Sequence, residues 1–246
     1  RDCLLSRGLG DVYKRQDKKE ISFLEPAFGT GAFYSALLSE CDKHAKIINT
    51  AVGVEVDKDF YVAANELWGH TNVNLVSGDF TEIEAFENIN FLVSNPPYVR
   101  HHYIDKEQKS KLSAMIQKET DLSLSGLSGL YCYFILSAHK WLAPDAICGW
   151  LIPSEFMDVN YGAKLKEYFL NKVHLLRVHR YNPENCKFDD ALVSSCVVWF
   201  KNETMENNYD VEFSYGGTLE RPEVSRNVDR NTLGKSRKWT HFPTND

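Results

Sequence analysis

Short apolar runs alternate with longer helix-like stretches along most of this chain, and that alternation constrains the fold more than any other feature. The apolar runs predict strands near residues 21–25, 50–56, 72–77, 89–94, 146–152, 173–180 and 192–201. The stretches between them predict helices near residues 31–42, 58–68, 105–118, 129–142 and 161–171. Strands that alternate with helices form a parallel sheet with helices on both faces. We therefore expect an α/β fold with a doubly wound, mostly parallel seven-stranded sheet.

The last part of the chain follows a different pattern. Residues 181–191 join the last two predicted strands without a helix signal, which predicts an antiparallel edge strand. Residues 209–215 alternate in polarity and predict a further edge strand. From Gly216 onward the sequence is polar, with Pro222 and mixed charges, and we interpret this part as a linker.

The composition indicates one α/β domain with tails, because 246 residues suffice to bury a large core. The formal net charge of −6 argues mildly against binding of a nucleic acid by this chain alone. The six cysteines show no paired short spacing, so we expect neither a metal site nor a disulfide framework. The sequence shows no apolar run of membrane-spanning length and no signal-peptide pattern, and we expect a cytoplasmic protein.

A glycine-containing loop follows the first predicted strand. Residues 25–33 read EPAFGTGAF and lead into the helix predicted from residue 31. Glycines let a backbone approach a ligand closely, and the start of a helix offers free N–H groups. The loop lacks the third glycine of a dinucleotide fingerprint and the Gly-Lys-Ser/Thr of a phosphate loop. This pattern argues against NAD and ATP as ligands.

Two acidic residues stand at the ends of the next two predicted strands. Glu55 ends the second strand, where a carboxylate can accept both hydroxyls of a ribose. Asp79 ends the third strand, where a carboxylate can accept from an adenine amino group while the Phe80 N–H donates to the ring. Acids at strand ends also cap the following helix, and we favour that role for Asp57 and Thr81. For Glu55 and Asp79 we favour the ligand role.

The tetrapeptide Asn95, Pro96, Pro97 and Tyr98 follows the predicted strand at residues 89–94. The Asn95 side-chain oxygen and a proline-locked carbonyl can accept both hydrogens of an exocyclic amine, and the Tyr98 ring can stack on the planar group that carries it. The two prolines fix φ and remove backbone donors, which stiffens the loop. This pattern favours methyl transfer to a flat, amide-like nitrogen. A strand that merely ends in a proline turn is the structural alternative.

Taken in order, these motifs resemble those of N6-adenine DNA methyltransferases of the gamma class. That class comprises the TaqI-like enzymes and the methylase part of bifunctional type II restriction–modification proteins. The motifs that carry the resemblance are residues 25–33, Glu55, Asp79 with Phe80, and residues 95–98. The similarity continues at residues 99–102, 130–134, 141–144, 149–156 and 188–195, so that it covers roughly residues 21–202.

The resemblance implies the Rossmann-like fold of class I S-adenosylmethionine-dependent methyltransferases, with S-adenosylmethionine as the cofactor. It also implies site-specific methylation of double-stranded DNA at N6 of a flipped adenine, within a restriction–modification system; we expect a monomer. The cofactor-binding residues that it implies are Glu25, Pro26, Ala27, Phe28, Gly29, Gly31, Glu55, Asp79, Phe80 and Asn95. The catalytic residues that it implies are Asn95, Pro96, Pro97, Tyr98 and Phe188, the last from its offset from Val193.

Three other functions fit parts of the pattern. Methyltransferases that act on a protein glutamine amide or on an RNA base use the same tetrapeptide or close variants of it. The continuation at residues 99–102 and the similarity over residues 141–195 favour DNA over both. A cytosine-N4 enzyme more often carries Ser or Thr in place of Asn95. A non-catalytic DNA-binding remnant of the fold is disfavoured by the presence of Asn95, Tyr98 and Asp79.

The two ends of the chain depart from the family pattern. Residues 1–16 resemble translated sequencing-adapter DNA, and we expect native sequence to begin near Asp17. The family's usual first motif, which covers the methionine end of the cofactor, would then be missing, so we expect weak cofactor binding. We expect the catalytic domain over residues 17–202 and an edge strand with a linker over residues 203–246, leading toward a target recognition domain outside the chain.

Overall fold

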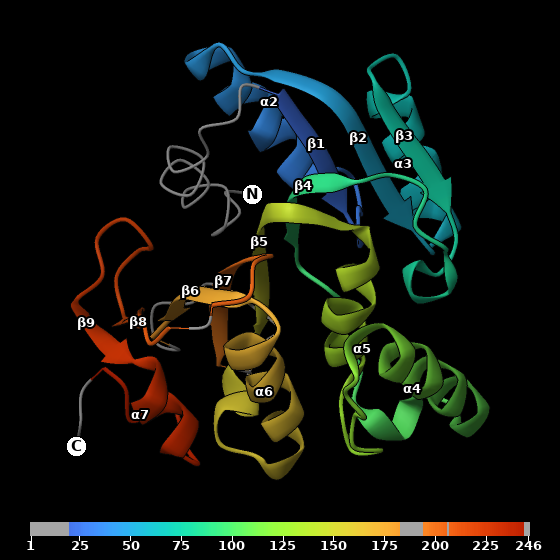
Figure 1. Cartoon of the computed structure of the whole chain (residues 1–246). Coiled ribbons are helices and arrows are strands. Elements are labelled where there is room, and N and C mark those ends of the chain that lie inside the picture. Colours follow the sequence, from blue (N-terminus) through green and yellow to red (C-terminus); the bar gives the residue numbers. More distant parts are fainter. Residues whose placement is uncertain (1–19, 183–193, 206, 244–246) are drawn as a thin grey trace.

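The computed structural model describes residues 20–182, 194–205 and 207–243. Its strands are β1 (Glu20–Glu25), β2 (Ile47–Glu55), β3 (Val73–Ser77), β4 (Ile89–Ser94), β5 (Leu142–Pro153), β6 (His174–Arg180), β7 (Ser195–Lys201), β8 (Asp210–Tyr215) and β9 (Val224–Asp229). Its α-helices are α2 (Ala32–His44), α3 (Lys58–Trp68), α4 (Lys106–Thr120), α5 (Leu130–Ser137), α6 (Ala163–Asn171) and α7 (Arg230–Lys235). The alternation predicted from the sequence is therefore present (Figure 1).

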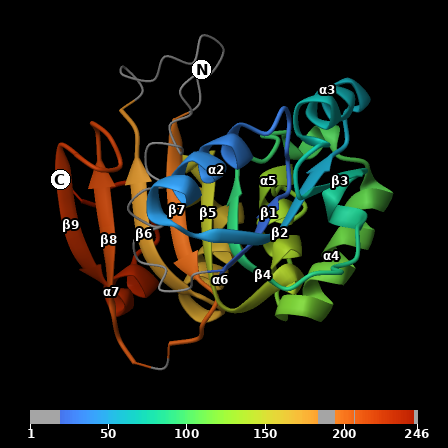
Figure 2. The same ribbon diagram turned by 90° about the horizontal axis from the view of Figure 1, so that it is seen from above.

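The strands form one nine-stranded sheet in the order β3-β2-β1-β4-β5-β7-β6-β8-β9, which Figure 2 shows from above. The strands β1 to β5 pair in parallel with their neighbours in this group. From β1 the chain runs outward to β2 and β3, whereas from β4 it runs the other way to β5. The order reverses between β1 and β4, and this is the position at which open α/β sheets bind their ligands.

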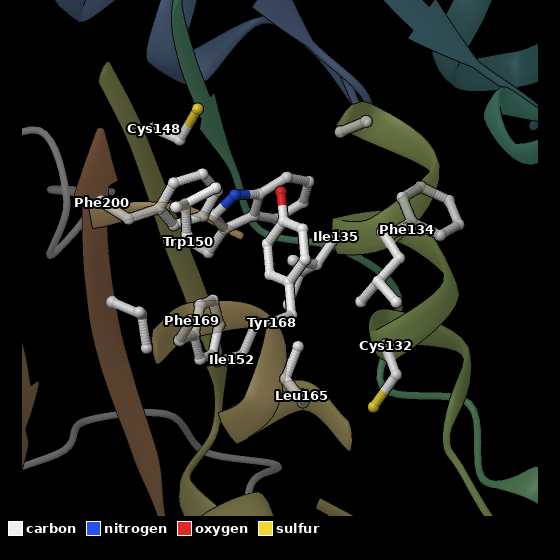
Figure 3. Packing of buried hydrophobic residues seen from close by; sticks show 14 of the residues in the cluster. Cys132, Phe134, Ile135, Cys148, Trp150, Ile152, Leu165, Tyr168, Phe169 and Phe200 are labelled. Atoms are coloured by element: carbon white, nitrogen blue, oxygen red, sulfur yellow. The ribbon is translucent and has the colours of Figure 1, made fainter. Parts of the chain in front are cut away.

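Two apolar cores cover the two faces of the sheet. Helices α2 and α3 pack on one face, and α4, α5, α6 and α7 pack on the other. Alternation along the strands divides the side chains between the faces, since Phe23 of β1 joins the first core and Leu24 the second. In the second core, Tyr168 and Phe169 of α6 pack against Phe200 of β7, each with ring centroids 5.8 Å apart (Figure 3).

The C-terminal part differs from the predicted linker. Residues 224–229 form β9, which pairs antiparallel with β8, and α7 follows it. Trp239, which is only 1 % exposed, packs edge-on against Phe156 and Phe213. Val228 and Leu233 are also buried. The buried apolar residues here are spaced too widely to produce a periodic signal, which is why the sequence pattern missed these elements.

The number of strands and the position of the antiparallel strand also differ from the prediction. The sheet has nine strands, not seven, because β8 and β9 extend it beyond β6. Strand β7 is antiparallel to both β5 and β6, as the lack of a helix signal in the connecting sequence suggested, but it lies inside the sheet and not at its edge. The edge is formed by β9, so β8 is an inner strand as well. Among the described residues, no helix has the length and apolar character needed to cross a membrane.

Candidate functional site

The motif residues lie at the carboxyl ends of four neighbouring parallel strands. Glu25 is the last residue of β1, Glu55 is the last residue of β2, and Asn95 follows the last residue of β4. Asp79 comes two residues after the end of β3, and the Gly78 N–H donates to the Glu55 carbonyl at 3.0 Å. The carboxyl ends of β1 to β4 therefore bring the predicted cofactor residues and the predicted catalytic loop to one edge of the sheet.

The glycine loop is held tightly between β1 and α2. The Phe28 N–H donates to the Val54 carbonyl at 2.9 Å, and the Gly31 N–H donates to the Phe28 carbonyl at 2.8 Å. Gly29 and Gly31 both have left-handed backbone conformations, with φ of +53° and +81°. A Cβ at Gly31 would lie 2.5 Å from Trp68 Nε1, whereas a Cβ at Gly29 would meet no atom within 4 Å. Gly31 is thus needed for packing, and Gly29 faces open space where a ligand could approach the backbone.

Glu55 connects the glycine loop to the end of β2. Its Oε2 accepts the Gly29 N–H at 2.7 Å, and its Oε1 accepts the Asp57 N–H at 2.8 Å. The next residue, Val56, is 67 % exposed, so a large apolar side chain lies in solvent directly beside this carboxylate. A single exposed apolar side chain is common on protein surfaces, but this one stands where it could contact a ligand held by Glu55. Sequence reasoning did not single out Val56, because its exposure depends on how the loop after β2 turns.

The cap of the helix after β3 is Asp79 and not the predicted Thr81, and Asp79 has a second contact as well. Its Oδ1 accepts from the Thr81 N–H at 2.9 Å and the Thr81 hydroxyl at 2.6 Å, which caps the short 3₁₀ helix η1 (Phe80–Glu82). Its Oδ2 accepts from the side-chain amide of Gln108 at 3.3 Å. The Phe80 ring is buried in the core, so only its backbone could contact a ligand. Sequence reasoning missed Gln108, since no motif links it to the acid 29 residues earlier.

Asp57 has the helix-capping role predicted for it. Its Oδ1 accepts from the backbone N–H groups of Asp59 and Phe60, at 2.9 and 3.2 Å, at the start of α3. Glu55 and Asp57 also differ in the backbone groups that their carboxylates bond. The Glu55 carboxylate bonds the glycine loop as well as the turn after β2, whereas Asp57 Oδ1 caps the helix that follows.

Glu25 is a buried carboxyl group beneath the glycine loop, and it is only 2 % exposed. Burial raises the pKa of Glu25 well above its usual value, hydrogen bonds from the Tyr34 and Phe33 backbone oppose that rise, and the nearby Glu55 adds to it. Of the neighbouring loop residues, Pro26 is buried and Ala27 packs against the second core. Glu25 thus lies behind the loop, where it contacts the first turn of α2.

The predicted catalytic loop, residues 95–98, follows β4, and two hydrogen bonds tie this loop and the residue after it to β5 and α5. Asn95 is exposed and Pro96 is buried, while Pro97 is exposed and Tyr98 is half-buried. The Tyr98 hydroxyl donates to the Leu151 carbonyl of β5 at 3.2 Å. The Val99 carbonyl accepts the Leu130 N–H at the start of α5, at 2.9 Å. These contacts fix the Tyr98 ring and leave the Asn95 side chain accessible.

The remaining predictions for the site concern Phe188 and metal binding. Phe188, the predicted second stacking residue, lies outside the described residues. Within the described part of the chain, no group of three or more His, Cys, Asp or Glu side chains is arranged to hold a metal ion. His102 is exposed, and the neighbouring His101 is half-buried, on the segment after the catalytic loop.

Solved structures with the same fold define its class. The chain superposes on a protein of Listeria monocytogenes assigned to the class I S-adenosylmethionine-dependent methyltransferases with a TM-score of 0.71, at 17 % identity, over 90 % of this chain and 67 % of that one. The type IIG restriction endonuclease BpuSI gives a TM-score of 0.73 at 16 % identity, over 98 % of this chain and 32 % of that one. The fold is therefore that of the class I methyltransferases, and the predicted fold class is confirmed.

Sequence comparison defines the family. Residues 38–186 match the Eco57I restriction-modification methylase family. The Type II methyltransferase M.AccI of Acinetobacter calcoaceticus is 30 % identical over 190 residues, which are 77 % of this chain and 34 % of that protein. The Type II methyltransferase M.XamI of Xanthomonas campestris pv. amaranthicola is 26 % identical over 125 residues, which are 50 % of this chain and 24 % of that protein. The chain belongs to the Eco57I restriction-modification methylase family and spans about a third or less of these relatives.

Proposed function

We propose that this chain is the methyl-transferring part of a restriction–modification DNA methyltransferase that acts on N6 of adenine. The observation that carries the proposal is the position of Asn95 and its Pro-Pro-Tyr continuation at the carboxyl end of β4, beside the switch point of the sheet. Glu55 and Asp79 lie at the same edge, as a nucleoside-containing methyl donor requires. Family membership supports DNA as the substrate class, since the relatives are named Type II methyltransferases.

S-adenosylmethionine is the proposed cofactor, and when bound it supplies a methyl group activated by a sulfonium. The residues present fit this group. Gly29 faces open space, so the cofactor could approach the loop backbone closely. Glu55 would accept the ribose hydroxyls, because each carboxylate oxygen can accept more than the one N–H it now bonds. Asp79 and the Phe80 N–H would hold the adenine edge, and Val56 would offer an apolar contact for its face.

The target base would be held by the catalytic loop. Adenine N6 cannot be reached inside a duplex, so the base must leave the stack, which costs a few kcal/mol. Stacking on Tyr98 would offset roughly 1–3 kcal/mol of that cost. Because its hydroxyl bonds the Leu151 carbonyl, the ring is oriented before the base arrives. A preoriented stacking face loses less freedom on binding than a mobile one. We propose Phe188 for the opposite face of the base.

The chemistry of transfer follows from the two acceptors at the amine. Asn95 Oδ1 and the Pro96 carbonyl would each accept one hydrogen of N6, which favours a pyramidal nitrogen whose lone pair is free to form the new N–C bond. As this bond forms, the bond between the methyl carbon and the sulfonium would break and its electron pair would stay on sulfur, leaving a neutral thioether. The positive charge would pass to N6, where the same two acceptors would stabilise it without having to reorient. A proton then leaves N6 to solvent. A dedicated base is not required, because the amine reacts before it loses a proton.

The test identifies the methylated nucleoside. The chain is incubated with methyl-labelled S-adenosylmethionine and duplex DNA, and the digested DNA is analysed by mass spectrometry. A chimaera in which this chain replaces the matching part of M.AccI is assayed in parallel, because it retains the remainder of that relative. We expect N6-methyladenine, and Asn95→Ala should form it on the order of a hundred- to a thousandfold more slowly.

Three results would contradict parts of the proposal. N4-methylcytosine would refute the adenine assignment. In parallel reactions with an RNA or a protein in place of the DNA, label in RNA or in a protein glutamine, with none in DNA, would refute the substrate class. If the chain and the chimaera both bind S-adenosylhomocysteine but both leave the DNA unlabelled, methyl transfer to DNA is refuted.

A further inference from the structure

Gln108, in the first turn of α4, contacts the carboxylate predicted to hold the cofactor's adenine. Its side-chain nitrogen lies 3.3 Å from Asp79 Oδ2. The other oxygen, Oδ1, is engaged by both the N–H and the hydroxyl of Thr81. Oδ2 is therefore the oxygen through which Asp79 contacts residues outside its own turn, and its partner is the Gln108 side-chain amide.

The position of Gln108 is fixed by the helix that carries it. Asp105 caps α4 by accepting the N–H groups of Glu107 at 2.8 Å and Gln108 at 3.3 Å. One turn further along, Lys111 pairs with Glu82 of η1 at 3.1 Å. The face of α4 with Gln108 and Lys111 thus runs alongside the η1 turn. The contact with Asp79 is part of this interface and not the chance position of a surface side chain.

The orientation of the amide defines what the pair can recognise. With its nitrogen donating to Asp79, the Gln108 carboxamide keeps its carbonyl oxygen as an acceptor beside the carboxylate. An adenine amino group carries two hydrogens and can donate to two acceptors, and a carboxamide oxygen accepts one of them where Asn or Gln recognises adenine. Asp79 alone offers one outward oxygen, so the second acceptor must come from a neighbouring group.

We propose that Gln108 is a specificity-determining residue for the cofactor's adenine. Asp79 Oδ2 accepts one hydrogen of the adenine amine and the Gln108 carbonyl accepts the other. This inference rests on the proposed function, since it takes S-adenosylmethionine as the cofactor. A deaminated base presents a carbonyl oxygen to these two acceptors, and sites built to bond an amine discriminate strongly against analogues that lack it.

The experiment compares two cofactor analogues that differ at this group. The full chain is titrated calorimetrically with S-adenosylhomocysteine and with its deaminated analogue, S-inosylhomocysteine. We expect the wild type to prefer the adenosyl compound. Gln108→Leu, which removes the acceptor at similar volume, should weaken binding of the adenosyl compound roughly five- to tenfold and leave binding of the inosyl compound unchanged or stronger. The ratio of the two affinities therefore falls.

Lys111→Gln is the matched control, because it breaks the Lys111–Glu82 pair on the same face of α4 and leaves Asp79 untouched. It should bind both compounds as the wild type does. Equal weakening of both compounds by Gln108→Leu would show a merely structural role and overturn the inference, as would an unchanged ratio or an equal fall of the ratio in Lys111→Gln. In those cases the proposed function stands. A wild type that binds neither compound would overturn the proposed cofactor and this inference together.

Discussion

The two glycines of the loop after β1 should respond very differently to the same substitution. Gly31→Ala places a Cβ 2.5 Å from Trp68 Nε1 and 2.8 Å from the Phe28 ring, at a residue with φ of +81°. The left-handed backbone costs about 1–2 kcal/mol for a non-glycine residue, and overpacking adds about 1–3 kcal/mol. Trp68 cannot move aside freely, because its Nε1 donates to the Thr30 carbonyl at 2.8 Å. We expect Gly31→Ala to lower the free energy of unfolding by roughly 2–5 kcal/mol.

Gly29→Ala is the matched comparison. Its φ of +53° carries the backbone penalty of about 1–2 kcal/mol, but a Cβ there meets no atom within 4 Å. The stability loss should therefore be limited to that penalty. The new methyl group would occupy the open space beside the loop backbone, so binding of S-adenosylhomocysteine should weaken. The prediction is a separation of effects, with Gly31→Ala acting mainly on stability and Gly29→Ala mainly on ligand affinity.

Urea unfolding followed by circular dichroism gives the stability of each variant, and calorimetric titration gives the affinity. Two results would refute the reasoning. The first is a Gly31→Ala variant no less stable than Gly29→Ala, which would mean that the packing around Trp68 is loose. The second is a Gly29→Ala variant with wild-type affinity, which would mean that the open space beside Gly29 is not the ligand site.

Three further outcomes are expected. Asn95→Ala should reduce single-turnover methylation on the order of a hundred- to a thousandfold while affecting cofactor affinity far less, because its bond strengthens as charge develops; equal losses in both would contradict a transition-state role. Tyr98→Phe keeps the stacking face but loses the hydrogen bond to the Leu151 carbonyl, so the binding of a flipped 2-aminopurine, measured by its fluorescence, should weaken by about 0.5–1.5 kcal/mol. An effect as large as that of Tyr98→Ala would show that the hydroxyl matters more than the ring. Burial raises the pKa of Glu25, so the folded state holds its proton more tightly than the unfolded state, and wild-type stability should fall as pH rises from the unfolded pKa of about 4.3 through the folded pKa. The urea midpoints of Glu25→Gln should lack this fall and should exceed those of the wild type at neutral pH. Parallel pH curves for the two proteins would disprove the link to Glu25.

The sequence pattern was sufficient to predict the strands of the parallel half of the sheet. Strand β4 is a short run of mostly buried apolar residues, so it was predicted with its observed bounds, Ile89–Ser94. Helix α3 was also placed correctly, because Asp57 is a typical cap directly before it. The order of the motifs along the chain then placed Glu55, Asp79 and Asn95 at one edge, since the ends of parallel strands meet there.

The pattern failed where folding depends on contacts between distant residues. Strand β9 has only one buried residue, Val228, and pairs with β8 through its backbone, so it carries little apolar signal of its own. Trp239 is buried because it contacts residues far earlier in the chain, and its backbone N–H donates to the Met157 carbonyl at 3.1 Å. The contact between Gln108 and Asp79 has the same origin, because it arises from the path of α4 past η1 and not from any local motif.

The central claim is that the carboxylates at the strand ends bind a nucleoside cofactor, and Glu55 and Asp57 test it most directly. Both are acids at the end of β2, but the Glu55 carboxylate bonds the glycine loop, whereas the Asp57 carboxylate caps α3. Calorimetric titration with S-adenosylhomocysteine should show binding by the wild type, loss of binding in Glu55→Ala and retained binding in Asp57→Ala, which should lose only about 1 kcal/mol of stability. Equal binding heats in the wild type and Glu55→Ala, or loss of binding in the folded Asp57→Ala variant alone, would contradict the account.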